Sequence, residues 1–144
     1  MKFLGKRKPE MAAPQALASP GPAATRKVTT RQRGNAAEDK ALAFLQAAGL
    51  QLVERNYRTP GRGGGEIDLV MRDRGGTLVF VEVRSRASSA FGGAGASISA
   101  VKQQRIVFAA RHYLLRMPSP PPCRFDVVLV EESVEWLQAA FDAQ

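Results

Sequence analysis

Residues 65–86, GEIDLVMRDRGGTLVFVEVRSR, have the pattern of two β-strands joined by a tight turn. Apolar and β-branched residues predominate in 66–72 and 78–86, and Asp-Arg-Gly-Gly at 73–76 is typical of a hairpin turn. Each run carries a buried-looking acid, Asp68 in the first and Glu82 in the second. Acids are disfavoured in strands, so this pair is the first candidate for a functional site.

The register of the hairpin decides whether the two acids meet. A loop with an odd number of residues, centred on Gly75, pairs residues whose numbers sum to 150 and sets Asp68 opposite Glu82. A two-residue turn, Gly75-Gly76, shifts the sum to 151 and places the acids on opposite faces. Two like charges across a ladder are destabilising unless a cation lies between them. The first register therefore predicts a site for Mg²⁺ or Mn²⁺, the cations that suit oxygen ligands. The alternative is a solvated face.

The remaining pattern predicts one α/β domain over 34–144, with the element order αβββαβ and a short terminal element. The expected elements are a helix at 34–48, strands at 50–57, 66–72 and 78–86, a helix at 99–116, a strand at 124–131, and a helix or strand at 134–141.

Residues 1–33 hold most of the net charge of +8, with eight basic residues against one acid. They are rich in Ala and Pro and lack apolar periodicity, which predicts a disordered tail. The tail is expected to be a non-specific nucleic-acid-binding arm or a dispensable extension. Its prolines oppose the amphipathic helix of a transit peptide.

Composition excludes several classes. One cysteine, Cys123, permits no internal disulfide or thiolate zinc cluster and suits the cytoplasm. No apolar run approaches the roughly 20 residues of a membrane-spanning helix, so no membrane partner is expected. The only histidine, His112, is expected on a helix surface without a chemical role. Residues 34–117 have twelve bases and seven acids, which suits either a polyanion partner or an ordinary charged surface.

Glu38 lies on the same helical stripe as Ala41, Leu42 and Leu45. An unpaired carboxylate facing a core is costly. Either Glu38 belongs to a site beneath the helix, or it is a first-turn acid favoured by the helix dipole with its carboxylate in water.

Three motifs together resemble the YraN-like proteins: GEIDL at 65–69, VFVEVR at 79–84, and Lys102-Gln103 at the start of a helix. This family is assigned to the restriction-endonuclease-like PD-(D/E)XK superfamily and is similar to archaeal Holliday-junction resolvases. The resemblance covers 34–144, including Glu38 and the run RFDVV at 124–128.

The resemblance implies a restriction-endonuclease-like core, in which helices flank a mixed sheet. It also implies a metal-dependent endonuclease that hydrolyses phosphodiester bonds in DNA, with branched DNA of repair or recombination as one class of substrate. Asp68 and Glu82 would ligate Mg²⁺ or Mn²⁺ together with the backbone carbonyl of Val83, and Glu38 would complete the acidic site. Glu66, beside Asp68, adds a further acid.

The superfamily lysine falls at Arg84, a departure that bears on catalysis. Arginine binds phosphate and stabilises developing charge, but it stays protonated and cannot act as a general base. Lys102 would then supply an ammonium or contact phosphate; the alternative is a solvated helix start. The expected nucleic-acid contacts are Arg58, Arg62, Arg84, Lys102 and Gln103.

Two other functions stay open at this point. Arg84 favours a non-catalytic nucleic-acid-binding module that acts on the same fold with a partner protein. A structural or assembly protein with surface acids is the third class. Junction resolvases cut two strands as symmetric dimers, so a homodimer is a further expectation from the resemblance.

Overall fold

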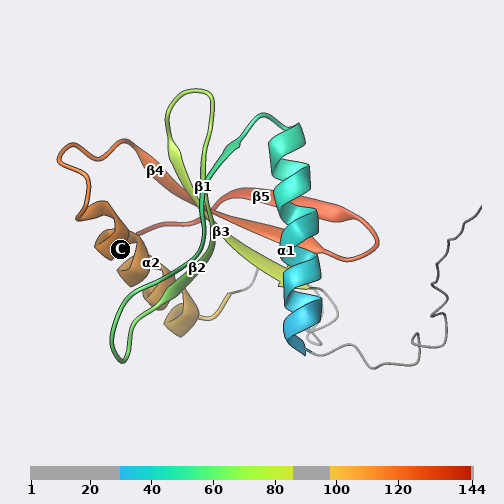
Figure 1. The fold of residues 1–144 in the computed structure, drawn as a ribbon, viewed down its shortest axis with the longest axis horizontal. Helices are drawn as coiled ribbons and strands as arrows, with labels where there is room; N and C mark the ends of the chain where they lie inside the picture. The colour runs from blue at the N-terminus through green and yellow to red at the C-terminus, as the bar shows by residue number, and fades with distance from the viewer. Residues whose placement is uncertain (1–29, 86–97, 144) are drawn as a thin grey trace, which may run out of the picture. The chain divides into compact units, whose positions relative to one another are not determined.

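The computed structural model describes residues 30–85 and 98–143, without the side chains of Thr30 and Arg33. The elements in chain order are α1 (Thr30–Ala47), β1 (Gln51–Arg58), β2 (Glu66–Arg72), β3 (Leu78–Ser85), α2 (Ala100–Leu114), β4 (Cys123–Val130) and β5 (Val134–Phe141) (Figure 1). Helix α1 begins four residues before its predicted start. The predicted tail lies almost wholly outside the described residues. The terminal element is a strand.

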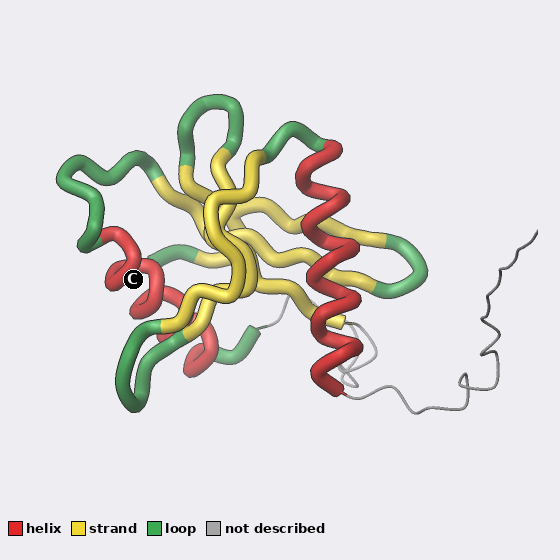
Figure 2. Tube along the Cα trace, in the orientation of Figure 1, coloured by secondary structure: helices red, strands yellow, loops and turns green. Residues whose placement is uncertain are grey.

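The described strands form one five-stranded mixed sheet in the order β1-β2-β3-β4-β5. Neighbours are antiparallel except β3 and β4, which run parallel, and α2 lies in the connection between them. A parallel pair requires such a crossover connection. Figure 2 shows the two helices, in red, on either side of the strands, in yellow. The predicted fold class is confirmed: the chain is α/β, with an arrangement compatible with a restriction-endonuclease-like core.

Each helix packs against one face of the sheet. Helix α1 contributes Ala37, Ala41 and Leu45 to a core that also contains Leu50, Leu69, Met71, Val79, Val81, Val128 and Val130. Helix α2 contributes Ile106, Val107, Ala109, Ala110 and Tyr113 to a second core with Tyr57, Ile67, Val70, Leu78, Phe80 and Phe125. Strand β3 alternates between the two cores, as expected for a strand covered on both faces.

The β2–β3 hairpin has the register that brings the acids together. Leu69 pairs with Val81, and Val70 pairs with Phe80, so the paired numbers sum to 150. The turn closes through a hydrogen bond from Asp73 N–H to the Thr77 carbonyl, and Gly76 has a φ of +91°. This is the odd-numbered loop with a left-handed glycine, and the other register is excluded.

A buried carboxylate connects β4, β5 and this turn. Asp126 is fully buried and accepts hydrogen bonds from Arg124 Nε (3.0 Å), Trp136 Nε1 (2.8 Å) and Ala139 N–H (2.9 Å). Arg124 Nη1 also lies 3.2 Å from Asp73 Oδ2. These donors from the described residues satisfy the Asp126 carboxylate, so its burial needs no ligand.

Ile67 packs in the α2 core beside Tyr57, its partner across the ladder, whereas Leu69 and Met71 of the same strand pack in the α1 core. His112 is half-exposed on helix α2, and its Nδ1 is 2.5 Å from the Tyr57 hydroxyl; that it has no chemical role stays a prediction. Within the described residues, neither helix has the length and hydropathy needed to cross a membrane.

Candidate metal and nucleic-acid site

Asp68 and Glu82 lie side by side at the end of the hairpin ladder. The paired residues of the ladder end at Leu69 and Val81, and Asp68 and Glu82 are the next residue on each strand. A hydrogen bond between their carboxyl groups is one of the contributions that raise the pKa of Asp68. Asp68 Oδ2 also accepts the Val83 N–H at 2.8 Å. Glu82 is only 7% exposed. Two acids inside the sheet thus contact each other, and Val83 contributes its backbone at the same point.

Burial dominates the electrostatics of this pair. It raises the pKa of Asp68 to about 7, assisted by the negative charge of Glu82 and opposed by the Val83 N–H and by Lys102. Burial also raises the pKa of Glu82, while Lys102, the hydrogen bond from Asp68 and Arg84 lower it. A proton therefore stays on the pair close to neutral pH, because two adjacent carboxylates without a cation cannot both ionise easily.

Lys102 places a positive charge beside the pair, with Nζ 3.6 Å from Glu82 Oε2. It lies in the first turn of α2, where the Ser99 side chain caps the helix by accepting the Lys102 N–H at 3.1 Å. The next residue, Gln103, uses its amide differently: Nε2 donates to the Ile98 carbonyl at 2.9 Å. Gln103 thus anchors the start of α2, and its predicted contact with nucleic acid stays a prediction.

Glu38 points inward from α1, with 12% of its side chain exposed. The alternative of a carboxylate in open water is therefore wrong. Its Oε1 lies 3.4 Å from Arg55 Nε. Burial and the negative charge of Asp68 raise the pKa of Glu38, and Arg55 opposes them. The charge of Asp68 therefore acts on Glu38, but the ion-pair partner of Glu38 is Arg55.

The donor set fits a hard divalent cation. Mg²⁺ is commonly bound by one or two carboxylates and keeps several waters, which matches the Asp68–Glu82 pair. Across 30–85 and 98–143, no three Asp, Glu, His or Cys side chains form a group that could hold one ion. The role of Glu38 as a third ligand stays a prediction.

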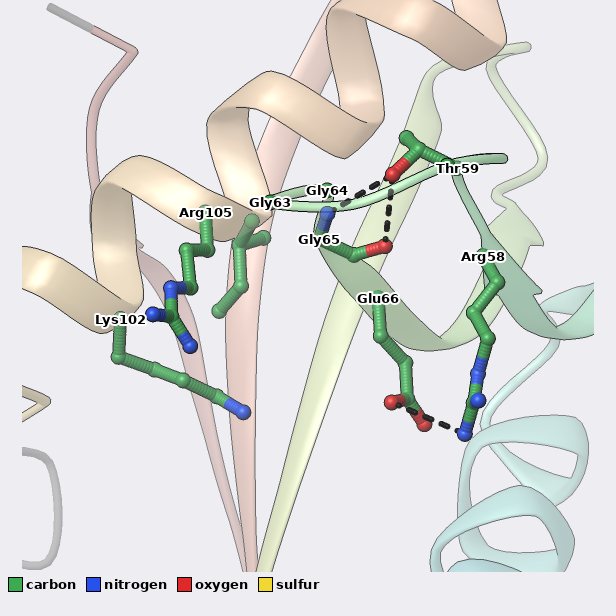
Figure 3. Close-up of a pocket in the computed structure, with 10 residues that line it drawn as sticks. Arg58, Thr59, Gly63, Gly64, Gly65, Glu66, Lys102 and Arg105 are labelled. Carbon is green, nitrogen blue, oxygen red and sulfur yellow. Dashed lines mark hydrogen bonds and ion pairs between the residues drawn. The ribbon is translucent and has the colours of Figure 1, made fainter.

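Two hollows lie near this pair and share Arg58 and Glu66. The first, of about 310 Å³, lies between the loop that joins β1 to β2 and helix α2 (Figure 3). Its lining is Arg58, Thr59, Gly61, Gly63, Gly64, Gly65, Glu66, Lys102, Arg105 and Ile106. The second, of about 670 Å³, is lined by Arg31, Gly34, Asn35, Glu38, Asn56, Arg58 and Glu66. The shared Arg58 and Glu66 form an ion pair with Nη2 and Oε1 3.5 Å apart.

Glycine allows the loop to approach α2. Thr59 N–H donates to the Gly65 carbonyl at 3.1 Å. Thr59 Oγ1 accepts the Gly65 N–H at 2.9 Å and donates to the Gly65 carbonyl at 3.4 Å, and these two contacts, drawn in Figure 3, help to close the loop. A β-carbon on Gly65 would lie 2.0 Å from the Arg105 carbonyl oxygen. Gly65 of the GEIDL motif is thus explained by backbone packing against the helix.

The other predicted residues take distinct places. Arg84 is partly buried near the end of β3, acts on Glu82 through its charge, and lines neither hollow. Arg62 is exposed in the loop and lines neither hollow. Arg105, which also lines the first hollow, was not predicted from the sequence; it follows Lys102 by three residues on one helix face. That spacing is the signal that could have identified it.

Residues 37–130 match the family described as "Uncharacterised protein family UPF0102". A UPF0102 protein of Paracidovorax citrulli is 78% identical over 127 residues, 88% of this chain and 93% of the relative. A UPF0102 protein of Verminephrobacter eiseniae is 67% identical and covers 100% of this chain and 98% of its own length. A third, from Acidovorax sp., is 72% identical over 80% of this chain and 88% of the relative. The chain therefore belongs to the uncharacterised protein family UPF0102, the family of the YraN-like proteins.

Proposed function

We propose that this chain is a metal-dependent nuclease that hydrolyses phosphodiester bonds in DNA, branched DNA included. The observation that carries the proposal is the contact between Asp68 and Glu82, buried carboxyl groups with Lys102 beside them. Adjacent acids whose pKa values are raised by burial are unfavourable for the fold alone and are typical of functional sites. Asp126 is a buried acid of the other kind, because three hydrogen-bond donors explain its burial without a functional role.

The chemistry of the side chains assigns some residues to metal binding and others to phosphate binding. Asp68, Glu82 and the Val83 carbonyl would hold Mg²⁺ or Mn²⁺, and Glu38 would add a ligand or hold water. The cation, when bound, would lower the pKa of water and stabilise charge that develops on the phosphate. Lys102 contributes positive charge next to Glu82, and the charge of Arg84 also acts on Glu82. Their part is to attract and orient the phosphate, since proximity and orientation supply much of such a rate enhancement.

A cleavage assay on branched, flapped and single-stranded DNA with Mg²⁺ or Mn²⁺ tests this function. Asp68→Asn and Glu82→Gln should each abolish metal-dependent cleavage, because each removes a ligand charge. Matched controls are Asp142→Asn and Glu132→Gln, which change exposed acids outside the site and should retain cleavage. A wild-type chain that cleaves none of these substrates with either metal would overturn the proposal.

A second function is a nucleic-acid-binding module that works with a partner protein. Arg84 at the position of the superfamily lysine favours it, because arginine cannot take up a proton from water. In that case Asp68→Asn would leave DNA affinity in the absence of metal unchanged, and wild-type cleavage would be absent. The same assay with a binding measurement separates the two functions.

A further inference from the structure

We propose that the hollow between the glycine loop, residues 59–65, and α2 is a subsite for one phosphate group of a nucleic-acid strand, with Arg105 as its principal ligand. This inference rests on the proposed function, because it names how the same site holds its substrate. The subsite is separate from the acid pair, and Arg105 is a binding residue with no part in the chemistry.

Cations from two directions surround the hollow. Figure 3 shows Lys102 and Arg105 extending from α2 on one side, with Arg58 and Glu66 on the other. Lys102 and Arg105 are three residues apart, which places both on one face of the helix. The hollow thus has three cationic side chains and one acid, and the glycine loop forms its wall. Such a net positive concave site attracts a phosphate.

The pairing of these cations singles out Arg105. Arg58 is paired with Glu66 at 3.5 Å, and Lys102 lies 3.6 Å from Glu82. None of the ion pairs among the residues that the structure describes includes Arg105. A guanidinium that lines a polar hollow and has no acid partner of its own can present its paired N–H donors to an anion, and phosphate oxygens match that geometry.

The glycines keep the hollow open. A β-carbon on Gly61 or Gly63 would meet no atom within 4 Å, and both have a positive φ, of +83° and +70°. This backbone is accessible to glycine at little cost, and it leaves no side chain between the loop and the cations. A volume of about 310 Å³ is at the small end of ligand pockets, which suits a phosphate with part of its sugar better than a stacked base.

Lys102 joins the subsite to the acid pair. Its ammonium lies near Glu82, and its side chain also lines the hollow. A phosphate held at Arg105 would therefore be a neighbour, along the nucleic-acid strand, of the phosphate that is cleaved at the acid pair. The group bound there is either an internal phosphodiester or a terminal phosphomonoester, since both present the same oxygens.

The test is binding of fluorescent single-stranded and branched oligonucleotides to the full chain by anisotropy, without divalent metal. Arg105→Gln should weaken binding about ten-fold, the effect expected for a charge-assisted contact. Arg74→Gln is the control, because it removes the same charge from an exposed residue of the β2–β3 turn and should change affinity far less. Equal affinities of the two variants for every probe would overturn the subsite.

Matched probes identify the source of the phosphate. If it is terminal, removal of the 5′- or 3′-phosphate from the probe should weaken wild-type binding and leave Arg105→Gln unaffected. If the phosphate is internal, replacing one phosphodiester by a neutral methylphosphonate should weaken wild-type binding at one position of the probe only, and it should leave binding by Arg105→Gln unaffected. Either result supports the subsite, and wild-type binding that is indifferent to both changes would overturn it.

The outcomes also separate this inference from the proposed nuclease. Loss of binding in Arg105→Gln without any wild-type cleavage would leave the subsite standing and overturn the nuclease. Cleavage by Arg105→Gln with an unchanged KM would overturn the subsite and leave the nuclease standing. Lys102→Gln, as a second variant in the same hollow, should also weaken binding, and thermal melting confirms that each variant is folded.

Discussion

Lys102 Nζ lies 3.6 Å from Glu82 Oε2, so a helix residue supplies positive charge to an acid pair that belongs to a β-hairpin. The side chain of Lys102 is 45% exposed and that of Glu82 only 9%. The ammonium is therefore hydrated and movable, while the carboxylate is fixed. In this arrangement Lys102 and a divalent cation would bind the same carboxylate, and they should compete.

The first prediction follows from this competition. Lys102→Gln should bind Mn²⁺ or Mg²⁺ a few-fold more tightly than the wild type, because a repelling charge is removed; the effect is modest since an exposed charge is screened. Cleavage should nevertheless fall, as the phosphate loses a contact. Titration calorimetry and single-turnover rates measure the two effects. Weaker metal binding by Lys102→Gln would show that the lysine assists the metal and does not compete with it.

The second prediction concerns pH. The pKa of Asp68 is about 7 in the folded chain, against 3.8 for an ordinary Asp. Between about pH 4 and pH 7 the folded chain keeps a proton that the unfolded chain has released. The free energy of unfolding should therefore fall as the pH rises through this range and level off above pH 7.

The size of this fall is on the order of 2–4 kcal/mol for a shift of this kind. Asp68→Asn should remove most of it, because the amide oxygen still accepts the Val83 N–H without titrating. Urea unfolding of both proteins at several pH values isolates the contribution of Asp68. Identical pH profiles for the two proteins would contradict the raised pKa. Added Mg²⁺ should stabilise the wild type above pH 7 more than Asp68→Asn.

The third prediction compares two glycines. Gly65→Ala should destabilise the chain by roughly 1–3 kcal/mol or more, because the new β-carbon would meet the Arg105 carbonyl at 2.0 Å and must displace the loop or the helix. Gly75→Ala is the matched control in another turn, where the nearest atom is Asp73 Oδ1 at 3.5 Å. Thermal melting compares the two. The same substitution that destabilises the fold should also weaken phosphate binding, since it moves Arg105.

The sequence was most informative where the signal is local. Strand β2 was predicted with its observed bounds, Glu66–Arg72, because its alternation and the following turn residues are contiguous. The turn residues allowed two registers, and the sequence showed that only the odd-numbered loop would join Asp68 to Glu82. The choice between the two registers needed the structure, in which Asp73 accepts the Gly75 and Thr77 N–H groups and stabilises the odd-numbered loop.

The missed features depend on contacts between distant segments. Glu38 was left open between two orientations because its partner, Arg55, is 17 residues away on β1. The hollow at Arg105 forms only when the loop before β2 meets α2, which spacing along the chain cannot reveal. Asp126 was part of a quoted motif, but its burial depends on donors from β5.

The last prediction concerns Asp126, which tests whether a buried acid in this chain is structural. Asp126→Ala should cost about 3–5 kcal/mol, because it leaves Arg124, the Trp136 indole and the Ala139 N–H without their acceptor. Trp136→Phe should cost less, about 1–3 kcal/mol, since Asp126 keeps its other donors. Denaturant unfolding of both variants gives these values.

Above pH 7 and without metal, the two substitutions should change the free energy of unfolding differently. Asp68→Asn relieves an unfavourable charge and should leave it unchanged or raise it, whereas Asp126→Ala should lower it strongly. A destabilisation of Asp68→Asn as large as that of Asp126→Ala would mean that the fold itself needs the Asp68 carboxylate, and the case for a functional acid pair would fail.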